Sequence, residues 1–291
     1  MIRRADFLFS TLILNCALIV FLTAPARGAG EVSVYAVIKD TVVKQTDVAV
    51  EAPGGTPNHF DARVLPTSNG SVTGATVTLP AGSTATSPQA LSATNDGTGS
   101  YGFTAKFADQ ATLDANYKDG SYALSITGAS STVYNAALFV SGGVYPSETP
   151  IVSNTGWSGG NLIVDPSAAF TLNWNSFASG TGASDRIFLD IRNIGTGQSL
   201  FLQFLPSTTT SQSFGANFFQ PNQSYDVGLG FVKVTSLNTE DISGATGYGG
   251  FGNEDSFTIQ TIPEPSTLVL ATAGFLLLSA LTIRRSRRYS A

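Results

Sequence analysis

Three aspartates are the side chains in this sequence with the clearest capacity for chemistry. Asp185, Asp190 and Asp226 lie on or beside segments expected to be strands, and glycoside hydrolysis requires only two carboxyl groups about 5 to 10 Å apart across a cleft. A secreted glycoside hydrolase is therefore one alternative for the function. A simpler interpretation makes Asp190 part of a surface ion-pair strip with Arg186 and Arg192 on one strand face.

The only histidine, His59, limits the other catalytic possibilities. A Ser-His-Asp triad would have to use His59 and Asp61, yet no Gly-x-Ser-x-Gly motif accompanies them. Histidine-based zinc sites need more imidazoles than the one in this chain, and the only cysteine, Cys16, lies in an N-terminal apolar segment. We therefore expect His59 to be a polar residue at a strand edge, with no catalytic residue and no metal site.

Cofactors are not expected, although calcium is an alternative. Asn95, Asp96 and Asp119 could offer oxygen ligands to that ion. These residues stand next to glycines, where Asn and Asp commonly serve turn conformation instead. Turn chemistry is the preferred interpretation of all three.

One tryptophan is a candidate for binding carbohydrate. Trp157 stands in the glycine-rich segment NTGWSGGN, and an exposed indole ring there would stack on a sugar. The alternative is a ring that packs at a junction between domains. A carbohydrate-binding module or lectin is thus a second alternative for the function.

The charge of the chain argues against nucleic acid as a partner. Residues 30–262 carry eight Lys and Arg against 18 Asp and Glu, which gives this stretch a net charge of −10. A surface of this sign repels phosphate backbones. The remaining basic residues are confined to the two ends.

The segments that must position any site alternate between apolar and polar residues, with no sustained helical period. Such short alternating runs predict an all-β protein, and they lie at residues 31–40, 59–65, 74–80, 100–107, 121–128, 133–140, 161–165, 170–174, 185–193, 199–205, 224–236 and 255–262. We expect the glycine-rich residues 247–257 to form a flexible loop or a juxtamembrane approach, in which Glu254 and Asp255 are solvated.

A weak internal repeat predicts two tandem domains. Tyr122 and Tyr225 each follow a turn and a serine and open an alternating run, 103 residues apart. That offset is the size of one immunoglobulin-like or fibronectin-like sandwich, and each tyrosine suggests a tyrosine corner. We expect β-sandwiches over residues 31–143 and 151–261, with Trp174 as a core residue. One large β-sandwich or jelly roll is the alternative.

The N-terminus has the pattern of a secretory signal peptide over residues 1–28. Arg3 and Arg4 precede an apolar stretch from Phe7 to Leu22, and small residues follow it. Export and removal by signal peptidase are expected.

The C-terminus predicts one membrane span with a fixed orientation. Residues 267–283 contain no charge and are just long enough to cross a bilayer as a helix. The cluster at 284–288 follows, and by the positive-inside rule it stays in the cytoplasm, so the bulk of the chain faces outward. The cluster consists of Arg284, Arg285, Arg287 and Arg288.

The tripeptide Pro263-Glu264-Pro265, the short span and the terminal arginines resemble the PEP-CTERM sorting signal over residues 262–290. The resemblance implies processing by an exosortase, a membrane protease of bacteria that produce exopolysaccharide. It also implies that the chain is anchored in the inner membrane before it reaches the cell surface or extracellular matrix.

These patterns together predict an exported, non-enzymatic structural or adhesive protein associated with exopolysaccharide. Its expected processing enzymes are signal peptidase and exosortase.

Overall fold

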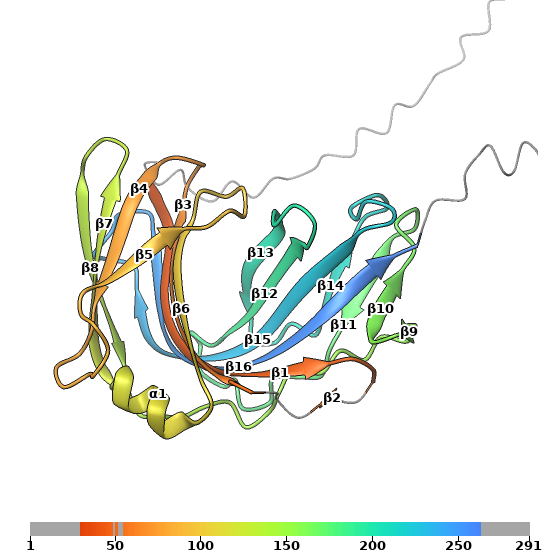
Figure 1. The fold of residues 1–291 in the computed structure, drawn as a ribbon, viewed down its shortest axis with the longest axis horizontal. Coiled ribbons are helices and arrows are strands. Elements are labelled where there is room, and N and C mark those ends of the chain that lie inside the picture. The colour runs from red at the N-terminus through yellow and green to blue at the C-terminus, as the bar shows by residue number, and fades with distance from the viewer. Residues whose placement is uncertain (1–29, 49, 52–54, 263–291) are drawn as a thin grey trace, which may run out of the picture.

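A computed structural model describes residues 30–48, 50–51 and 55–262 of the chain (Figure 1). The fold is mostly β, as predicted, and contains one short helix, α1 (Gln110–Asn116), that the sequence pattern did not predict. The strands are β1 (Val32–Gln45), β2 (Val50–Glu51), β3 (Asn58–Pro66), β4 (Val72–Thr78), β5 (Gln89–Ala93), β6 (Tyr101–Phe107), β7 (Gly120–Gly128), β8 (Val133–Val140), β9 (Trp157–Ser158), β10 (Asn161–Val164), β11 (Phe170–Asn173), β12 (Arg186–Asn193), β13 (Ser199–Pro206), β14 (Ser211–Phe214), β15 (Ser224–Asn238) and β16 (Thr246–Thr261).

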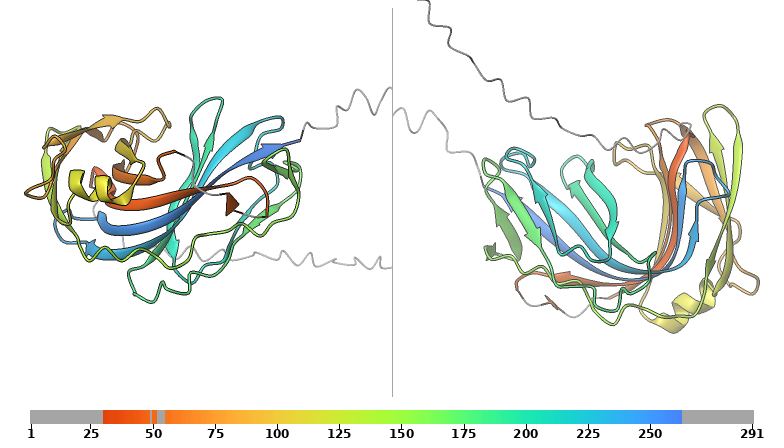
Figure 2. Two further views of the ribbon diagram at one scale, coloured as in Figure 1. Left: turned by 60° about the horizontal axis from the view of Figure 1, so that its bottom comes forward. Right: turned by 180° about the vertical axis from the view of Figure 1, so that it is seen from behind.

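One long sheet runs through both halves of the chain in the order β13-β12-β15-β16-β1-β3-β6-β5-β4-β7-β8. Its centre is a parallel pairing of β1 with β16, from Val34 opposite Thr246 to Lys44 opposite Ser256. The sheet curls into a trough (Figures 1 and 2): β1, β15 and β16 cross the bottom, and the strands on either side rise as two arms.

Two hydrophobic cores lie on the outer side of this trough. The first fills the space between β1, β3 and β6 and the facing strands β4, β7 and β8, and includes Tyr35, Phe60 and Leu138. The second packs β12, β15 and β16 against the separate two-stranded sheet of β11 and β14, and includes Leu172 and Phe231.

The predicted boundary near residues 141–150 separates these cores only in part. Residues before it build most of the first core, and residues after it build all of the second. However, Phe251 of β16 belongs to the first core, and the pairing of β1 with β16 crosses the boundary. The division into two tandem sandwiches therefore stays a prediction, because both halves contribute strands to one sheet.

The two repeated tyrosines have equivalent environments. Tyr122 is fully buried and its hydroxyl donates to the carbonyl of Lys118 at 2.6 Å. Tyr225 is also fully buried, and its hydroxyl accepts from the amide of Gln220 at 2.7 Å. Both bond to backbone a few residues upstream, as a tyrosine corner does. Trp174 is buried in the second core, as predicted.

The expectation of a flexible loop at 247–257 is wrong, because these residues lie inside β16. Here the glycines permit close approach of neighbouring groups. A Cβ atom on Gly247 would stand 2.2 Å from the ring of Tyr35, and one on Gly250 would stand 2.1 Å from the carbonyl oxygen of Lys233. Glycine in a strand often marks such an approach, and the packing against β1 and β15 outweighs its low strand propensity.

The predicted signal peptide and the predicted span at 267–283 lie outside the described residues. Within the described part of the chain, no helix has the length and apolar character needed to span a bilayer.

Substitution of Gly247 by alanine tests the packing of β16 against Tyr35 of β1. The added methyl group collides with Tyr35, so we expect the free energy of unfolding to fall by about 1 to 3 kcal/mol, measured by urea denaturation. Gly74 is the control, because nothing lies within 4 Å of the position of its Cβ. Equal stabilities of Gly247→Ala and Gly74→Ala would contradict the placement of residue 247 in the interior.

A charged groove on the concave face of the sheet

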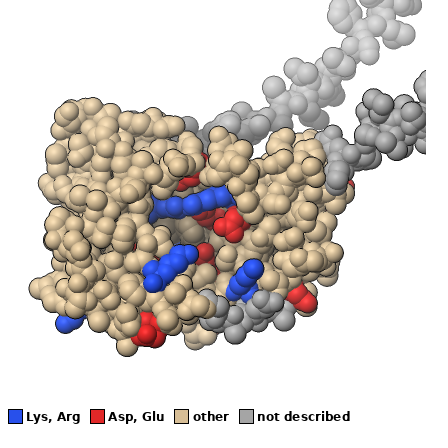
Figure 3. Space-filling model, viewed as in Figure 1, with Lys and Arg blue, Asp and Glu red and all other residues tan. Residues whose placement is uncertain are grey.

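The trough contains a groove of about 500 Å³. Its surface is seen in Figure 3, where Lys and Arg side chains lie beside Asp and Glu in a hollow between the two arms. The ionisable residues that line the groove are Asp40, His59, Asp61, Arg63, Lys106, Asp190, Arg192, Asp226 and Glu254.

Strand alternation explains why these residues share one face. On β1, Tyr35 and Val37 point into the first core, whereas Val34, Ile38 and Asp40 line the groove. Successive side chains of a strand point to opposite faces of the sheet, and β3, β6, β12, β15 and β16 follow the same rule. On β12 the residues that alternate with the groove-lining ones, Ile187, Leu189 and Ile191, are fully buried on the core face.

Pairing register gives the groove an apolar end and a charged end. At one end Val34 lies opposite Leu65. At the other end Asp40 lies opposite His59, and Val42 lies opposite Glu254. A ligand in the groove therefore meets both hydrocarbon and ionisable groups along one direction.

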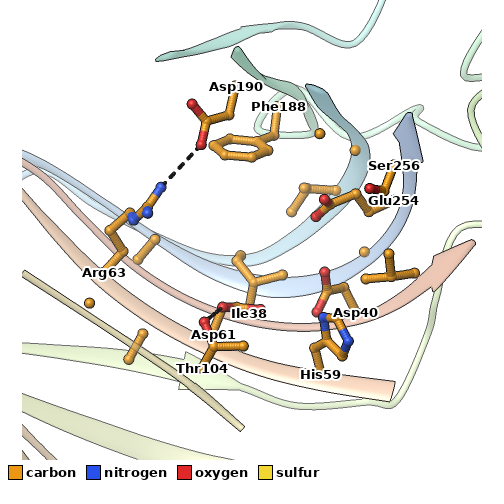
Figure 4. A pocket seen from close by; sticks show the side chains of 18 of the residues that line it. Ile38, Asp40, His59, Asp61, Arg63, Thr104, Phe188, Asp190, Glu254 and Ser256 are labelled. Atoms are coloured by element: carbon orange, nitrogen blue, oxygen red, sulfur yellow. Dashed lines mark hydrogen bonds and ion pairs between the residues drawn. The ribbon is translucent and has the colours of Figure 1, made fainter. Parts of the chain in front are cut away.

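The charged end brings Asp40, His59 and Asp61 together, and Glu254 points into the same region from β16 (Figure 4). The atoms of the first three that can bind a metal lie within 4.8 Å of one another. The hydroxyl of Thr104 donates to Asp61, and Nε2 of His59 lies 3.1 Å from the carbonyl oxygen of Thr56. This cluster contains the only histidine of the chain.

Burial and mutual repulsion change the acidity of this cluster. Burial raises the pKa of Asp40 well above its usual range, and the carboxylates of Asp61 and Glu254 raise it further. Burial and the charge of Asp61 raise the pKa of Glu254 to about 7. The pKa of His59 is lowered, chiefly because burial disfavours the imidazolium. Carboxylates held this close are costly unless a proton or a cation neutralises them.

The expectation that His59 occupies a strand edge is wrong. β3 lies between β1 and β6, and His59 pairs with Asp40 on one side and Lys106 on the other. The sequence pattern predicted the strand, but a pairing between distant segments decides what faces His59.

The middle of the groove contains an ion-pair network. Asp190 Oδ2 lies 2.5 Å from Arg192 Nη2 and 3.6 Å from Arg63 Nη1. The predicted pairing with Arg192 is thus confirmed. Arg186 was expected in the same ion-pair strip, but its guanidinium donates to the backbone carbonyls of Ala183 and Asp185 instead.

The other two predicted carboxylates have different positions. Asp226 lines the groove, where partial desolvation of its carboxyl group raises its pKa. Asp185 is buried and accepts hydrogen bonds from the backbone amides of Gly182 and Val234. Asp185 therefore stabilises the local backbone through these hydrogen bonds. Of the three aspartates, the fold brings Asp190 and Asp226 into the groove.

Trp157 lies outside the set of residues that line the groove. Its indole Nε1 donates to the carbonyl of Asn154 at 2.9 Å, and its ring packs edge-on against Phe257 of the second core, with 5.8 Å between centroids. These contacts match the interpretation of a packing residue. A role of Trp157 in binding carbohydrate stays a prediction.

Two of the three candidates for calcium, Asp96 and Asp119, have partners within the protein. Thr98 and Ser100 donate side-chain hydrogen bonds to Asp96, which is buried. Asp119 accepts from the buried ammonium group of Lys39 at 2.9 Å, as does Asp114 of α1. Asp96 thus shows the turn chemistry that the sequence pattern favoured.

Sequence reasoning missed Asp40 and misjudged Glu254 and Asp255. The expectation of solvated side chains at 254 and 255 is wrong: Glu254 lines the groove, and Asp255 is fully buried on the opposite face of β16. Burial raises the pKa of Asp255 to about 8. A usable signal was the alternation of 31–40, which already placed Asp40 on the face opposite to Tyr35 and Val37.

The predicted sorting residues, Pro263 to Pro265 and the arginine cluster, lie outside the described residues.

No protein-family model matches this chain, and no curated protein matches it. Among solved structures, the BSP domain of a biofilm associated protein is 12% identical, over 81% of this chain and 30% of that one, with a TM-score of 0.21. The FN1–FN3 domains of chicken CNTN1 are 8% identical, over 80% of this chain and 66% of that one, with a TM-score of 0.26. Tp47, the 47-kilodalton lipoprotein of Treponema pallidum, is 11% identical, over 76% of this chain and 50% of that one, with a TM-score of 0.25. The chain thus spans only 30% of the length of the first of these structures. Similarities this low do not indicate a function for this chain.

The hydrogen bonds of Asp96 predict an acid-sensitive contribution to stability. Burial alone would raise its pKa, but the bonds from Thr98 and Ser100 outweigh burial and lower the pKa to about 2, from 3.8 for the free side chain. Ionised Asp96 therefore stabilises the fold above pH 3.8, and this stabilisation is lost as the pH falls toward 2.

We expect Asp96→Asn to lower the free energy of unfolding by about 2 kcal/mol at pH 7 and by much less at pH 2. Urea denaturation at both pH values measures the difference. Glu240→Gln, at an exposed position in the β15–β16 connection, is the control. A loss that is equal at both pH values would show that the charge of Asp96 contributes nothing.

Proposed function

We propose that this chain is an exported, non-enzymatic protein of the cell surface or extracellular matrix, and that its groove binds an extended polysaccharide. The observation that carries the proposal is the composition of the groove, in which accessible phenyl rings stand beside an oriented ion-pair network. The sequence patterns at both ends support export.

The rings come from two neighbouring strands. Phe188 and Phe204 lie on β12 and β13, with 5.4 Å between their centroids, and both are partly exposed in the groove. A sugar ring presents an apolar face of C–H groups, and an aromatic side chain offers a flat apolar surface to match it. These two rings thus form a short stacking surface.

The polar contacts come from the network beside these rings. Asp190 holds Arg192 by an ion pair, and Nε of Arg192 is buried without a hydrogen-bond partner in the described structure. A buried donor without a partner is costly, and a ligand hydroxyl or carboxylate would satisfy it. Sites that combine apolar surface with a few oriented polar groups are typical of small-molecule and saccharide binding.

Glycoside hydrolysis is the second candidate, because Glu254 has a raised pKa beside other carboxylates in an open groove. The carboxylates of Asp61 and Glu254 both raise the pKa of buried Asp40, and the three residues gather at one end of the groove. Glycosidases instead place their two carboxyl groups on either side of the bond that they cleave, about 5 Å or more apart. Binding without hydrolysis is the better-supported function.

The binding proposal is tested with soluble exopolysaccharide purified from the host. We expect the wild-type chain to bind it in calorimetry, and Phe188→Ala and Arg192→Ala to weaken binding at least tenfold, since each removes one part of the contact. Phe139→Ala is the control, because Phe139 lies on β8, outside the groove, and is 55% exposed.

Equal affinities of the three variants and the wild type would contradict the proposal. Release of new reducing ends by the wild type, lost in Glu254→Gln, would favour the hydrolase instead.

The sorting proposal is tested by deletion of residues 263–265. We expect the wild type, recovered from envelope and medium, to lack the segment before about residue 31 and the tail from near Pro263. The deletion variant is expected to keep its tail. Intact mass measures both, and a wild-type chain that retains Arg284 to Ala291 would contradict processing by an exosortase.

A further inference from the structure

The geometry points to a divalent cation site at the charged end of the groove, formed by Asp40, His59, Asp61 and Glu254. This inference goes beyond the proposed function and does not depend on it. The cation is one of the first transition row, represented by Mn²⁺ and Zn²⁺.

The donor atoms of three of these residues lie close together. Ligand atoms of Asp40, His59 and Asp61 lie within 4.8 Å of one another. Ligands about 2.1 Å from one tetrahedral ion are about 3.4 Å apart, so movements of about 1 Å or less bring the three donor atoms to that spacing. The three residues lie on the paired strands β1 and β3, where Asp40 is directly opposite His59.

Independently of this clustering, Asp40 has a buried oxygen without a partner in the described structure. Asp40 is only 5% exposed, and its Oδ1 is buried without a hydrogen-bond partner in the described structure. A buried carboxylate oxygen in this condition costs free energy. A cation in the cluster would provide the missing partner.

Neighbouring groups orient two of the ligands, His59 and Asp61. A carbonyl oxygen can only accept, so His59 Nε2, which faces the carbonyl of Thr56 at 3.1 Å, must carry the proton. Nδ1 then keeps its lone pair. A hydrogen bond from the second ring nitrogen to a carbonyl is typical of histidines that bind metals. The hydroxyl of Thr104 fixes Asp61 in a similar way.

Glu254 can complete the site because two strands lack side chains beside it. A Cβ on Gly228 would stand 2.7 Å from Oε1 of Glu254, and one on Gly252 would stand 3.3 Å from Cβ of Asp40. These glycines leave room for the two carboxylates to approach each other across the floor of the groove.

The set of ligands determines the class of cation. Carboxylates alone would suit Ca²⁺ or Mg²⁺, whereas an imidazole nitrogen favours transition metals. One imidazole with up to three carboxylates therefore favours Mn²⁺ or Zn²⁺ over Ca²⁺ or Mg²⁺.

The test is calorimetry of the purified exported chain, after treatment with a chelator, against Mn²⁺, Zn²⁺, Ca²⁺ and Mg²⁺ separately. We expect one Mn²⁺ or Zn²⁺ per chain, bound at least tenfold more tightly than Ca²⁺ or Mg²⁺. Asp40→Asn and His59→Gln should each weaken binding at least tenfold. Glu240→Gln removes the same charge at a distant exposed position and should bind as the wild type does.

A second measurement identifies the ligands directly. Electron spin echo spectroscopy of bound Mn²⁺ should show coupling to one imidazole nitrogen, and His59→Gln should abolish it. Circular dichroism checks that each variant is folded. The inference is overturned by the absence of saturable binding, by equal binding in Asp40→Asn and Glu240→Gln, or by bound Mn²⁺ without nitrogen coupling.

Discussion

The parallel pairing of β1 with β16 is the interaction on which the rest of the structure depends. It joins a strand near residue 40 to one near residue 250; the first core contains residues of both strands, and the second contains residues of β16. Without it, the arms of the trough would belong to two separate sheets. Long-range pairing of this kind has a large entropic cost, which the burial of residues such as Tyr35, Phe251 and Phe257 offsets.

The groove is a consequence of that pairing together with strand alternation. Core packing uses one face of β1, β3, β12, β15 and β16, so the polar residues on the other face of these strands are brought together in the groove. The curl of the sheet then brings Arg63 of β3 within 3.6 Å of Asp190 of β12. Charges that are scattered along the sequence thereby become neighbours in a partly desolvated site, where their interactions are stronger than in water.

The local alternation of apolar and polar residues predicted most of the strands but little of the groove and its cluster of ionisable residues. The twelve alternating runs all correspond to strands, because burial of one face requires alternation within each strand. The pattern failed at residues 247–254, where the close approach of Tyr35 requires glycine and hides the strand. The cluster of Asp40, His59 and Glu254 could not be predicted, since its members meet only through the register of β1 with β3 and β16.

Amide hydrogen exchange of residues 247–257, followed by mass spectrometry, tests the central pairing most directly. If β16 is the central strand, these amides exchange as slowly as those of residues 35–44, because both sets open only when the sheet unfolds. Exchange of 247–257 within seconds, while 35–44 stays protected, would show a glycine-rich loop and would contradict both the shared sheet and the groove built on it.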